Sequence, residues 1–228
     1  KTAGQEYFKD RLSARGKILI KPEMWSHAYQ TAETLITHPF SSKYFDPLQI
    51  GVEIIYQYKF VTTVNGVKTK GMLDIVMVDH KEKKIYPIDL KTGEPPVELF
   101  NEVILMHKYY IQGALYKEAL MNIAANDPDL DGYTVEEFEF LYISKVNPFK
   151  PIVWIMPEEL HSASMNGFED RFGFKHRGVL DLLDSYYECK DGRYCEYEKE
   201  VYQNEGRVML EGMIKYENTR TQDWDCFK

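Results

Sequence analysis

The segment that most constrains the fold runs from Gly51 to Lys91, where apolar and polar residues alternate over much of its length. This period of two is typical of β-strands, because successive side chains leave opposite faces of a sheet. Asn65-Gly66 divides the segment, and this dipeptide favours a tight hairpin because both residues tolerate a positive φ. A turn at His80–Lys83 separates a second strand, near Lys70–Asp79, from a third over Lys84–Lys91. The segment therefore predicts an antiparallel meander.

Helical patterns lie on both sides of this meander. Lys21-Pro22-Glu23 predicts a helix start, since proline suits the first helical position and glutamate favours the positive end of the helix dipole. His38-Pro39 ends that helix. The later elements are predicted, in order, as a helix, two strands and a long last helix: roughly Glu98–Ala125, Glu136–Lys145, Ile152–Met156 and Pro157–Cys189. This order predicts an α/β (α+β) fold with a central mixed sheet flanked by helices.

Length and composition fit one soluble globular domain over residues 1–228, with a core at about 16–190 and a C-terminal extension, 191–228, to which no role is assigned. No apolar run approaches the roughly 20 residues of a membrane-spanning helix, so no membrane partner is expected. Three cysteines without CxxC spacing favour a reducing cytoplasm over a disulfide framework or a structural zinc site. A formal charge of −8 argues against nucleic acid only as an average, because a cleft can be locally basic and metal-binding carboxylates count as negative.

Two carboxylates and an ammonium interrupt the apolar strands of the meander. Asp74 stands alone in the apolar segment Gly71–Val78, and Asp89 and Lys91 are two apart, so their side chains leave the same face. An unpaired carboxylate in such surroundings is costly. A shared Mg²⁺ would explain the set, since this ion prefers oxygen ligands and takes few carboxylates from protein. The alternative is a buried structural Asp–Lys ion pair together with an aspartate that caps a turn.

Three segments, in order and spacing, resemble the motifs of PD-(D/E)XK nucleases: Gly71-Met72-Leu73-Asp74, Ile88-Asp89-Leu90-Lys91-Thr92-Gly93 and Gln112-Gly113-Ala114-Leu115-Tyr116. The branch they resemble is that of the RecB and RecE-like (phage-type) exonucleases, with the signature Gly-x-x-Asp, Asp-x-Lys-Thr and Gln-x-x-x-Tyr. Gly16–Pro39 is similar to the opening helix of that branch, and Phe138–Pro157 to its later strand and turn. The resemblance covers roughly residues 16–160 and implies a restriction-endonuclease-like core.

Carried over residue by residue, the resemblance implies that Asp74 and Asp89 bind metal and that Lys91 is the catalytic lysine. Asp89 stands where many members of the family have glutamate. Gln112 and Tyr116 are four apart and share one helical face, which the resemblance turns towards the catalytic site. Core packing is the alternative for Tyr116, and also for Tyr109, which lies about one turn before Gln112.

The resemblance names two further candidate metal ligands. Glu53 lies on the strand before the hairpin, where related exonucleases have an acidic residue, and a solvated strand glutamate is the alternative. His27 lies on an early helix, where the branch often has a metal-contacting histidine, and a polar surface histidine is the alternative. The candidate DNA-binding residues are Arg15, Lys17, Lys108 and Tyr109, for which ordinary solvated side chains are the alternative.

The resemblance therefore implies a Mg²⁺-dependent DNA exonuclease, with Mn²⁺ as a substitute ion, that works from DNA ends in phage-type recombination or DNA processing. It also implies DNA as the partner, a homo-oligomeric ring and a single-strand annealing protein. The expected location is the cytoplasm of a bacterial or phage-infected cell. The rival interpretations are a structure- or site-specific endonuclease of the same fold and a non-catalytic DNA-binding module.

Overall fold

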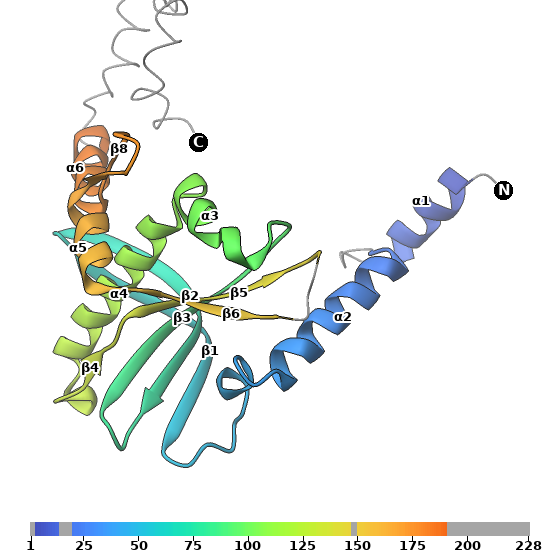
Figure 1. Cartoon of the computed structure of the whole chain (residues 1–228), viewed down its shortest axis with the longest axis horizontal. Helices are drawn as coiled ribbons and strands as arrows, with labels where there is room; N and C mark the ends of the chain where they lie inside the picture. The colour runs from blue at the N-terminus through green and yellow to red at the C-terminus, as the bar shows by residue number, and fades with distance from the viewer. Residues whose placement is uncertain (1–2, 14–19, 147–149, 191–228) are drawn as a thin grey trace, which may run out of the picture.

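The structure, a computed structural model, describes residues 3–13, 20–146 and 150–190 of the chain (Figure 1). A six-stranded sheet has the order β1-β2-β3-β5-β6, with β4 beside β3, and β7 and β8 form a separate pair. The strands are β1 (Val52–Val64), β2 (Val67–Asp79), β3 (Lys84–Gly93), β4 (Thr134–Val135), β5 (Phe138–Ser144), β6 (Ile152–Met156), β7 (Phe168–Glu169) and β8 (Lys175–His176). The helices are α1 (Ala3–Ser13), α2 (Pro22–Thr37), α3 (Phe100–Met106), α4 (Tyr109–Asn126), α5 (Glu158–Asn166) and α6 (Val179–Lys190), with single 3₁₀ turns η1 (Ser42–Tyr44), η2 (Val97–Leu99) and η3 (Pro128–Leu130).

The predicted meander is confirmed. β1 pairs antiparallel with β2 from Val52↔Asp79 to Val64↔Val67. Asn65 and Gly66 form the turn with φ values of 46° and 76°, the left-handed conformation that this dipeptide accepts without a large steric cost. β2 then pairs antiparallel with β3.

β3 and β5 are parallel, which makes the sheet mixed, as predicted. A parallel pair needs a long crossover, and here α3 and α4 provide it between the two strands (Figure 1). The crossover places α4 against the face of the sheet, where it contacts β1, β2, β3 and β5. Side chains at the start of α4 can therefore approach those of β3.

The two faces of the sheet bury separate apolar clusters. On one face α3 and α4, with contributions from α5 and α6, pack around fully buried side chains such as Phe100, Phe138 and Phe140. On the other face α2 and η1 contribute Leu35 and Tyr44 to a smaller cluster. Each fully buried Leu, Ile or Phe contributes about 1.5–3 kcal/mol relative to an exposed one, so both layers stabilise the sheet.

Two of the predicted helices are divided in the structure. The helix predicted over Glu98–Ala125 consists of η2, α3 and α4, because Lys108 adopts a left-handed backbone (φ 55°) that a continuous helix excludes. The helix predicted over Pro157–Cys189 consists of α5 and α6, with the β7–β8 hairpin between them. Gly167 and Gly173, at φ 86° and 82°, form the turns at which the chain leaves helical geometry.

None of the helices in the described ranges combines the length and the apolar character that crossing a bilayer requires. The predictions made for Cys195, Cys226 and the extension 191–228 concern residues outside the described ranges.

Candidate active site

The sheet forks at Asp74 and Asp89. The β2–β3 ladder ends at Ile75↔Ile88, yet both strands continue. Beyond this point β2 pairs only with β1, and β3 pairs only with β5. Extending the register by one residue places Asp74 opposite Asp89, where the strands diverge. The two carboxylates therefore lie at the apex of a fork with unpaired backbone on both inner edges.

The backbone of β1 is irregular at the same level. Gln57, which the register places opposite Asp74, has φ 55° and makes no ladder pair with it. Ile54 packs with the α2-side cluster, whereas Tyr58 and Phe60 pack with the α4-side cluster. The alternation predicted for the segment from Gly51 is therefore interrupted in β1, whose side chains change faces on either side of the left-handed Gln57. Such backbone conformations carry a local cost and are often found at functional sites.

Asp89, Lys91 and Gln112 form a closed polar triangle beside the fork. Lys91 Nζ lies 2.6 Å from Asp89 Oδ2. Gln112 Nε2 donates to Asp89 Oδ1 at 2.7 Å, and Lys91 Nζ donates to Gln112 Oε1 at 2.8 Å. Asp89 is buried, with 2% of its surface exposed. Each group thus fixes the other two, as a preorganised site requires.

Asp74 is held by the backbone of the opposite strand. Its Oδ2 accepts a hydrogen bond from Leu90 N at 2.9 Å, across the point where the ladder has ended. The side chain thereby replaces a missing ladder partner and satisfies a backbone donor of β3. The carboxylate is fixed beside Asp89, close enough for the two charges to repel each other.

Burial raises the pKa of the Asp89 carboxyl above its ordinary value of 3.8; the Lys91 ion pair and the Gln112 hydrogen bond oppose this rise, and the Asp74 charge adds to it. The folded pKa therefore exceeds the unfolded one. The Asp89 carboxyl holds its proton more tightly in the folded state than in the unfolded state. The stability that this protonation contributes is present below the unfolded pKa and is lost as pH rises through the folded pKa.

We expect Asp89→Asn to leave stability at neutral pH undiminished. The asparagine amide has no charged form, so the variant avoids the cost of burying a carboxylate. That cost outweighs the attraction between Asp89 and Lys91, because the pKa of Asp89 is raised in spite of this attraction. Relative to the intact protein, the unfolding midpoint of the variant should rise as pH increases from 4 to 7. Thermal unfolding in EDTA at several pH values measures this difference. A midpoint that falls relative to the intact protein over that range would contradict the burial argument.

The first turns of α4 carry the side chains that cover the fork. The ammonium of Lys91 lies 4.3 Å from the centre of the Tyr109 ring, a cation–π contact. Tyr116, one turn beyond Gln112, packs edge-on against Phe60 of the hairpin. A Cβ at Gly71 would clash with the Phe60 ring and come within 2.9 Å of the Tyr116 ring. Glycine at this position therefore allows α4 to approach β2.

A groove of about 460 Å³ adjoins this cluster along α4. Lys108, Tyr109 and Gln112 line it, together with Arg177, a residue that no sequence motif indicated. The Arg177 guanidinium donates to Asp181 O at 2.8 Å and also bonds Ser185 Oγ, which holds the side chain against α6. The groove thus joins the start of α4 to a segment nearly 70 residues away.

Two candidate metal ligands lie away from the fork. Glu53 pairs with Val78, four residues from Asp74, which is roughly 13 Å along the strand. Its carboxylate lies 3.3 Å from His80 Nε2 instead. His27 lies beside Leu90 and Thr92 in a groove between α2 and β3. Because these residues alternate with Asp89 and Lys91, His27 is on the opposite face of the sheet. Arg15 and Lys17 lie outside the described residues.

The fork fits a cation with few protein ligands. Within the described part of the chain no three His, Cys, Asp or Glu side chains are close enough to form a full metal cage. Mg²⁺ does not need one, because it is commonly bound by one or two carboxylates and keeps several waters. Asp89 Oδ2 is buried, and among the described residues its one partner is the ion-paired Lys91. An Asp74–Asp89 pair is therefore a suitable donor set for this ion.

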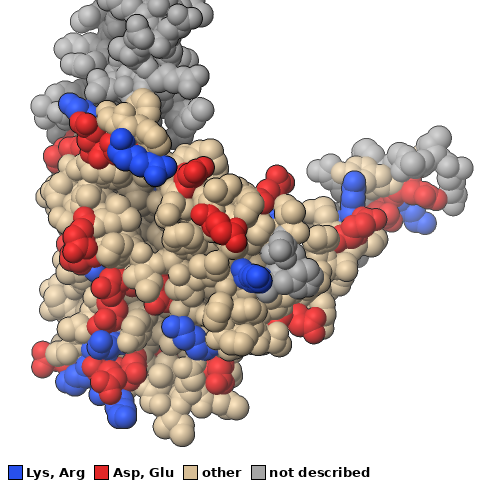
Figure 2. Space-filling view, viewed as in Figure 1, with Lys and Arg blue, Asp and Glu red and all other residues tan. Residues whose placement is uncertain are grey.

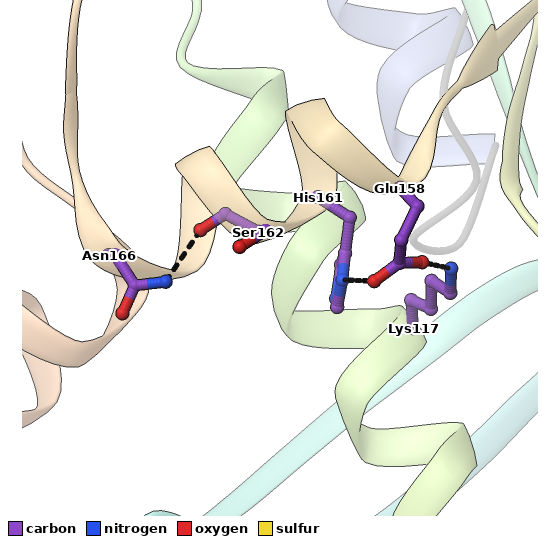
Figure 3. A network of polar contacts seen from close by, with 5 residues as sticks. All are labelled: Lys117, Glu158, His161, Ser162 and Asn166. Carbon is purple, nitrogen blue, oxygen red and sulfur yellow. Dashed lines mark hydrogen bonds and ion pairs between the residues drawn. The ribbon is translucent and has the colours of Figure 1, made fainter.

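A second polar network ties α4 to α5 (Figure 3). Lys117 Nζ lies 2.6 Å from Glu158 Oε2, and His161 Nδ1 lies 3.3 Å from Glu158 Oε1. Lys117 and His161 are buried, whereas the Glu158 side chain is 67% exposed. From the sequence, His161 near a helix start is expected to be an ordinary polar surface residue. Its burial is not predictable from the sequence, because it depends on how α5 packs against α4.

We expect the two ends of this ion pair to respond unequally to mutation. Glu158→Ala leaves the buried Lys117 ammonium without its partner and should destabilise the fold by about 1–3 kcal/mol. Lys117→Met keeps the volume and leaves only a solvated carboxylate, so its cost should be clearly smaller. Urea unfolding of both variants measures the difference. Equal losses of free energy of unfolding would show that burial of Lys117 does not govern the pair.

The comparisons support the fold and go no further. No protein-family model matches the chain, and no curated protein is significantly similar to it. Among solved structures, the chain is similar to the crystal structure of a putative exonuclease from Eubacterium rectale, with a TM-score of 0.51 and 14% sequence identity. The match covers 96% of this chain and 74% of that one. The chain therefore shares the fold of that protein, a central mixed sheet flanked by helices.

Proposed function

We propose that this protein is a metal-dependent deoxyribonuclease of the PD-(D/E)XK type, in the RecE/RecB-like branch, that hydrolyses phosphodiester bonds from DNA ends. The observation that carries the proposal is the fork, where Asp74 and Asp89 face each other and Lys91 and Gln112 are fixed beside them. The three motifs noted in the sequence meet at this point of the fold. A structural Asp–Lys pair would explain Asp89 and Lys91, but not the second carboxylate or the parting of the strands.

Asp74 and Asp89 would hold Mg²⁺, with Mn²⁺ as a substitute. When bound, the ion acts as a Lewis acid and lowers the pKa of coordinated water. Asp74 Oδ2 is oriented by Leu90 N, and Asp89 Oδ1 by Gln112 Nε2. These hydrogen bonds fix the carboxylates before any substrate arrives, which avoids reorganisation during the reaction.

Lys91 would act on the phosphate. Its ammonium, held by Gln112 Oε1 and by the Tyr109 ring, can donate a hydrogen bond to a phosphoryl oxygen as negative charge builds up there. Moving from Asp89 towards the phosphate would also free the carboxylate for the cation. Tyr116 and the adjoining groove with Lys108 would contact the DNA, where phosphate contacts by cations supply affinity.

A homo-oligomeric ring and a single-strand annealing partner belong to the same proposal, since ring-shaped relatives digest DNA processively. The exposed aromatic side chains Trp25 and Tyr29 on α2 offer apolar surface for subunit contacts. Light scattering at several protein concentrations measures the oligomeric state. A monomer at every concentration would remove the ring from the proposal without affecting the site.

The test of the function compares linear and covalently closed duplex DNA of the same sequence. With Mg²⁺, the linear form should release mononucleotides or short products, and the closed circle should stay intact. EDTA should stop the reaction. Cutting of the closed circle would identify an endonuclease of the same fold. Failure to cut linear, circular or single-stranded DNA with Mg²⁺ or Mn²⁺ would support the non-catalytic DNA-binding module instead.

A further inference from the structure

The outer part of the β1–β2 hairpin, Ile54–Leu73, carries no negative charge in a chain whose net charge is negative. The twenty residues from Ile54 to Leu73 contain no Asp or Glu, the longest such stretch in the sequence. The same stretch contains Lys59, Lys68 and Lys70. Figure 2 shows acidic and basic side chains interspersed over the viewed face. The formal charge of the whole chain is −8, so twenty residues with three lysines and no acidic residue depart from that average.

The three lysines share one face of the hairpin. The cross-strand pairs on this face are Lys59↔Met72, Val61↔Lys70 and Thr63↔Lys68, and all six side chains are exposed. The other face carries Phe60, Val64 and Val67, which are buried. Each pair therefore joins one lysine to a neutral residue. The outer face of the hairpin, defined by these three pairs, is a ribbon with one sign of charge.

No side chain within the described part of the chain neutralises these ammonium groups. Ion pairs of other lysines are present, such as those of Lys84 with Glu136 and of Lys117 with Glu158. Lys59, Lys68 and Lys70 make no comparable contact. Lysines beside each other on a strand repel, so intramolecular stability gives no reason for this arrangement. A polyanionic partner would remove the repulsion.

The position of the ribbon relates it to the fork. β2 runs without interruption from Lys70 to Asp74, four residues or roughly 13 Å along the strand. The hairpin turn is in turn anchored on α6, where Asn65 Nδ2 lies 3.4 Å from Asp184 Oδ1. Figure 1 shows the hairpin crossing beside α4 as it leaves the sheet. The lysines are thus carried by a supported element, and Lys70 and Lys68 lie within one turn of duplex DNA, about 34 Å, of Asp74 along the strand.

We propose that the outer face of the β1–β2 hairpin binds the phosphate backbone of duplex DNA and holds the duplex while its end is at the fork. The proposal rests on the proposed nuclease function for its partner. Lysine contacts to phosphate are independent of sequence, as an enzyme that digests any end requires. Thr63 adds a neutral hydrogen-bond donor, and Val61 and Met72 keep the spaces between the lysines free of competing charge.

The test measures binding, so that it does not depend on cleavage. Fluorescence anisotropy follows the full chain and a labelled 20-base-pair duplex in EDTA, over a range of salt concentrations. Each phosphate contact contributes about 0.9 to the slope of log affinity against log salt. The triple variant Lys59→Gln, Lys68→Gln, Lys70→Gln should therefore lose about 2.7 from that slope, and single variants about 0.9 each. Between 50 and 200 mM salt, the affinity of the triple variant should therefore fall about 40-fold less than the affinity of the intact protein.

The matched control is Lys43→Gln, Lys81→Gln, Lys175→Gln, which removes the same charge from other exposed positions. This control should change the slope of log affinity against log salt by no more than about 0.9, the contribution of one phosphate contact. Both triple variants should unfold at the midpoint of the intact protein, because they change exposed side chains only.

The outcomes separate this inference from the proposed function. A slope that falls in the hairpin variant and not in the control supports the inference, even if no cleavage is ever seen. Equal slopes in both variants overturn the inference, and they leave the nuclease proposal standing if linear DNA is still digested. Binding of the intact protein to phosphatidylserine vesicles but not to duplex DNA would also overturn it, since the face would then serve an anionic membrane surface.

Discussion

Lys91→Ala is expected to lower the rate of DNA hydrolysis by at least ~100-fold, because removing one preorganised charge-stabilising donor costs about 10²–10³ in rate. The Lys91 ammonium contacts Asp89, and the Gln112 amide and the Tyr109 ring fix its position. Initial rates on end-labelled duplex with saturating Mg²⁺ measure the effect. Because the proposed role of Lys91 is to contact the phosphate during bond breaking, the loss should appear in kcat more than in KM.

The control for this prediction is Lys84→Ala, which removes a lysine from the same strand at its other end. Lys84 pairs with Glu136, and both side chains are partly exposed. Such an exposed pair contributes about 0–1 kcal/mol, so folding and activity should change little. Lys91→Arg should recover only part of the rate, since a planar guanidinium does not fit the contacts of an ammonium. Full activity in Lys91→Ala would remove Lys91 from the mechanism.

Phe100→Ala is expected to destabilise the fold by about 3–5 kcal/mol, the usual cost of deleting a buried aromatic side chain. Phe100 is fully buried at the start of α3. Its ring stacks on Tyr142 at 4.4 Å between centroids and meets Phe140 edge-on at 5.8 Å. Tyr142 and Phe140 lie beside Lys91 and Asp89 in the β3–β5 register, so the cavity would open directly behind the site. Urea unfolding measures the loss of free energy, and activity should fall with it.

Leu99→Ala is the matched control for the aromatic deletion. Leu99 precedes Phe100 in the chain and is 44% exposed. Exposed substitutions of this kind usually stay within about 0.5 kcal/mol. A loss below about 1 kcal/mol for Phe100→Ala would mean that the α3–β5 contact adds little to the core, contrary to the packing seen here.

The parts of the fold that the sequence predicts are those that local patterns determine. The period of two and Asn65-Gly66 determine the hairpin, and the turn at His80–Lys83 determines the return of β3. Once these two turns are placed, the register brings Asp74 to the level of Asp89. Gln112 reaches the same point because the parallel β3–β5 pair requires a crossover, and α4 provides it.

The remaining features depend on contacts between distant segments. No local pattern reveals that Lys108 turns left-handed and divides a helix, or that Gln57 reverses the alternation of β1. Glu53 fits an acidic position on the strand before the hairpin, but four residues of strand separate it from the carboxylate pair. His27 fits a histidine on an early helix, but α2 covers the other face of the sheet. For both residues, tertiary packing determines where the side chain lies relative to the carboxylate pair. The spacing of residues along the sequence does not contain this information.

Mn²⁺ binding by the intact protein would establish that the fork holds a divalent cation. Electron paramagnetic resonance reports the free ion during a titration of the intact protein, of Asp74→Asn and Asp89→Asn, and of Asp79→Asn as a control on the same strand. We expect a site in the intact protein and in Asp79→Asn that is lost or greatly weakened in the two fork variants. Unchanged Mn²⁺ binding when both fork carboxylates are replaced would show that the cation does not bind at the fork.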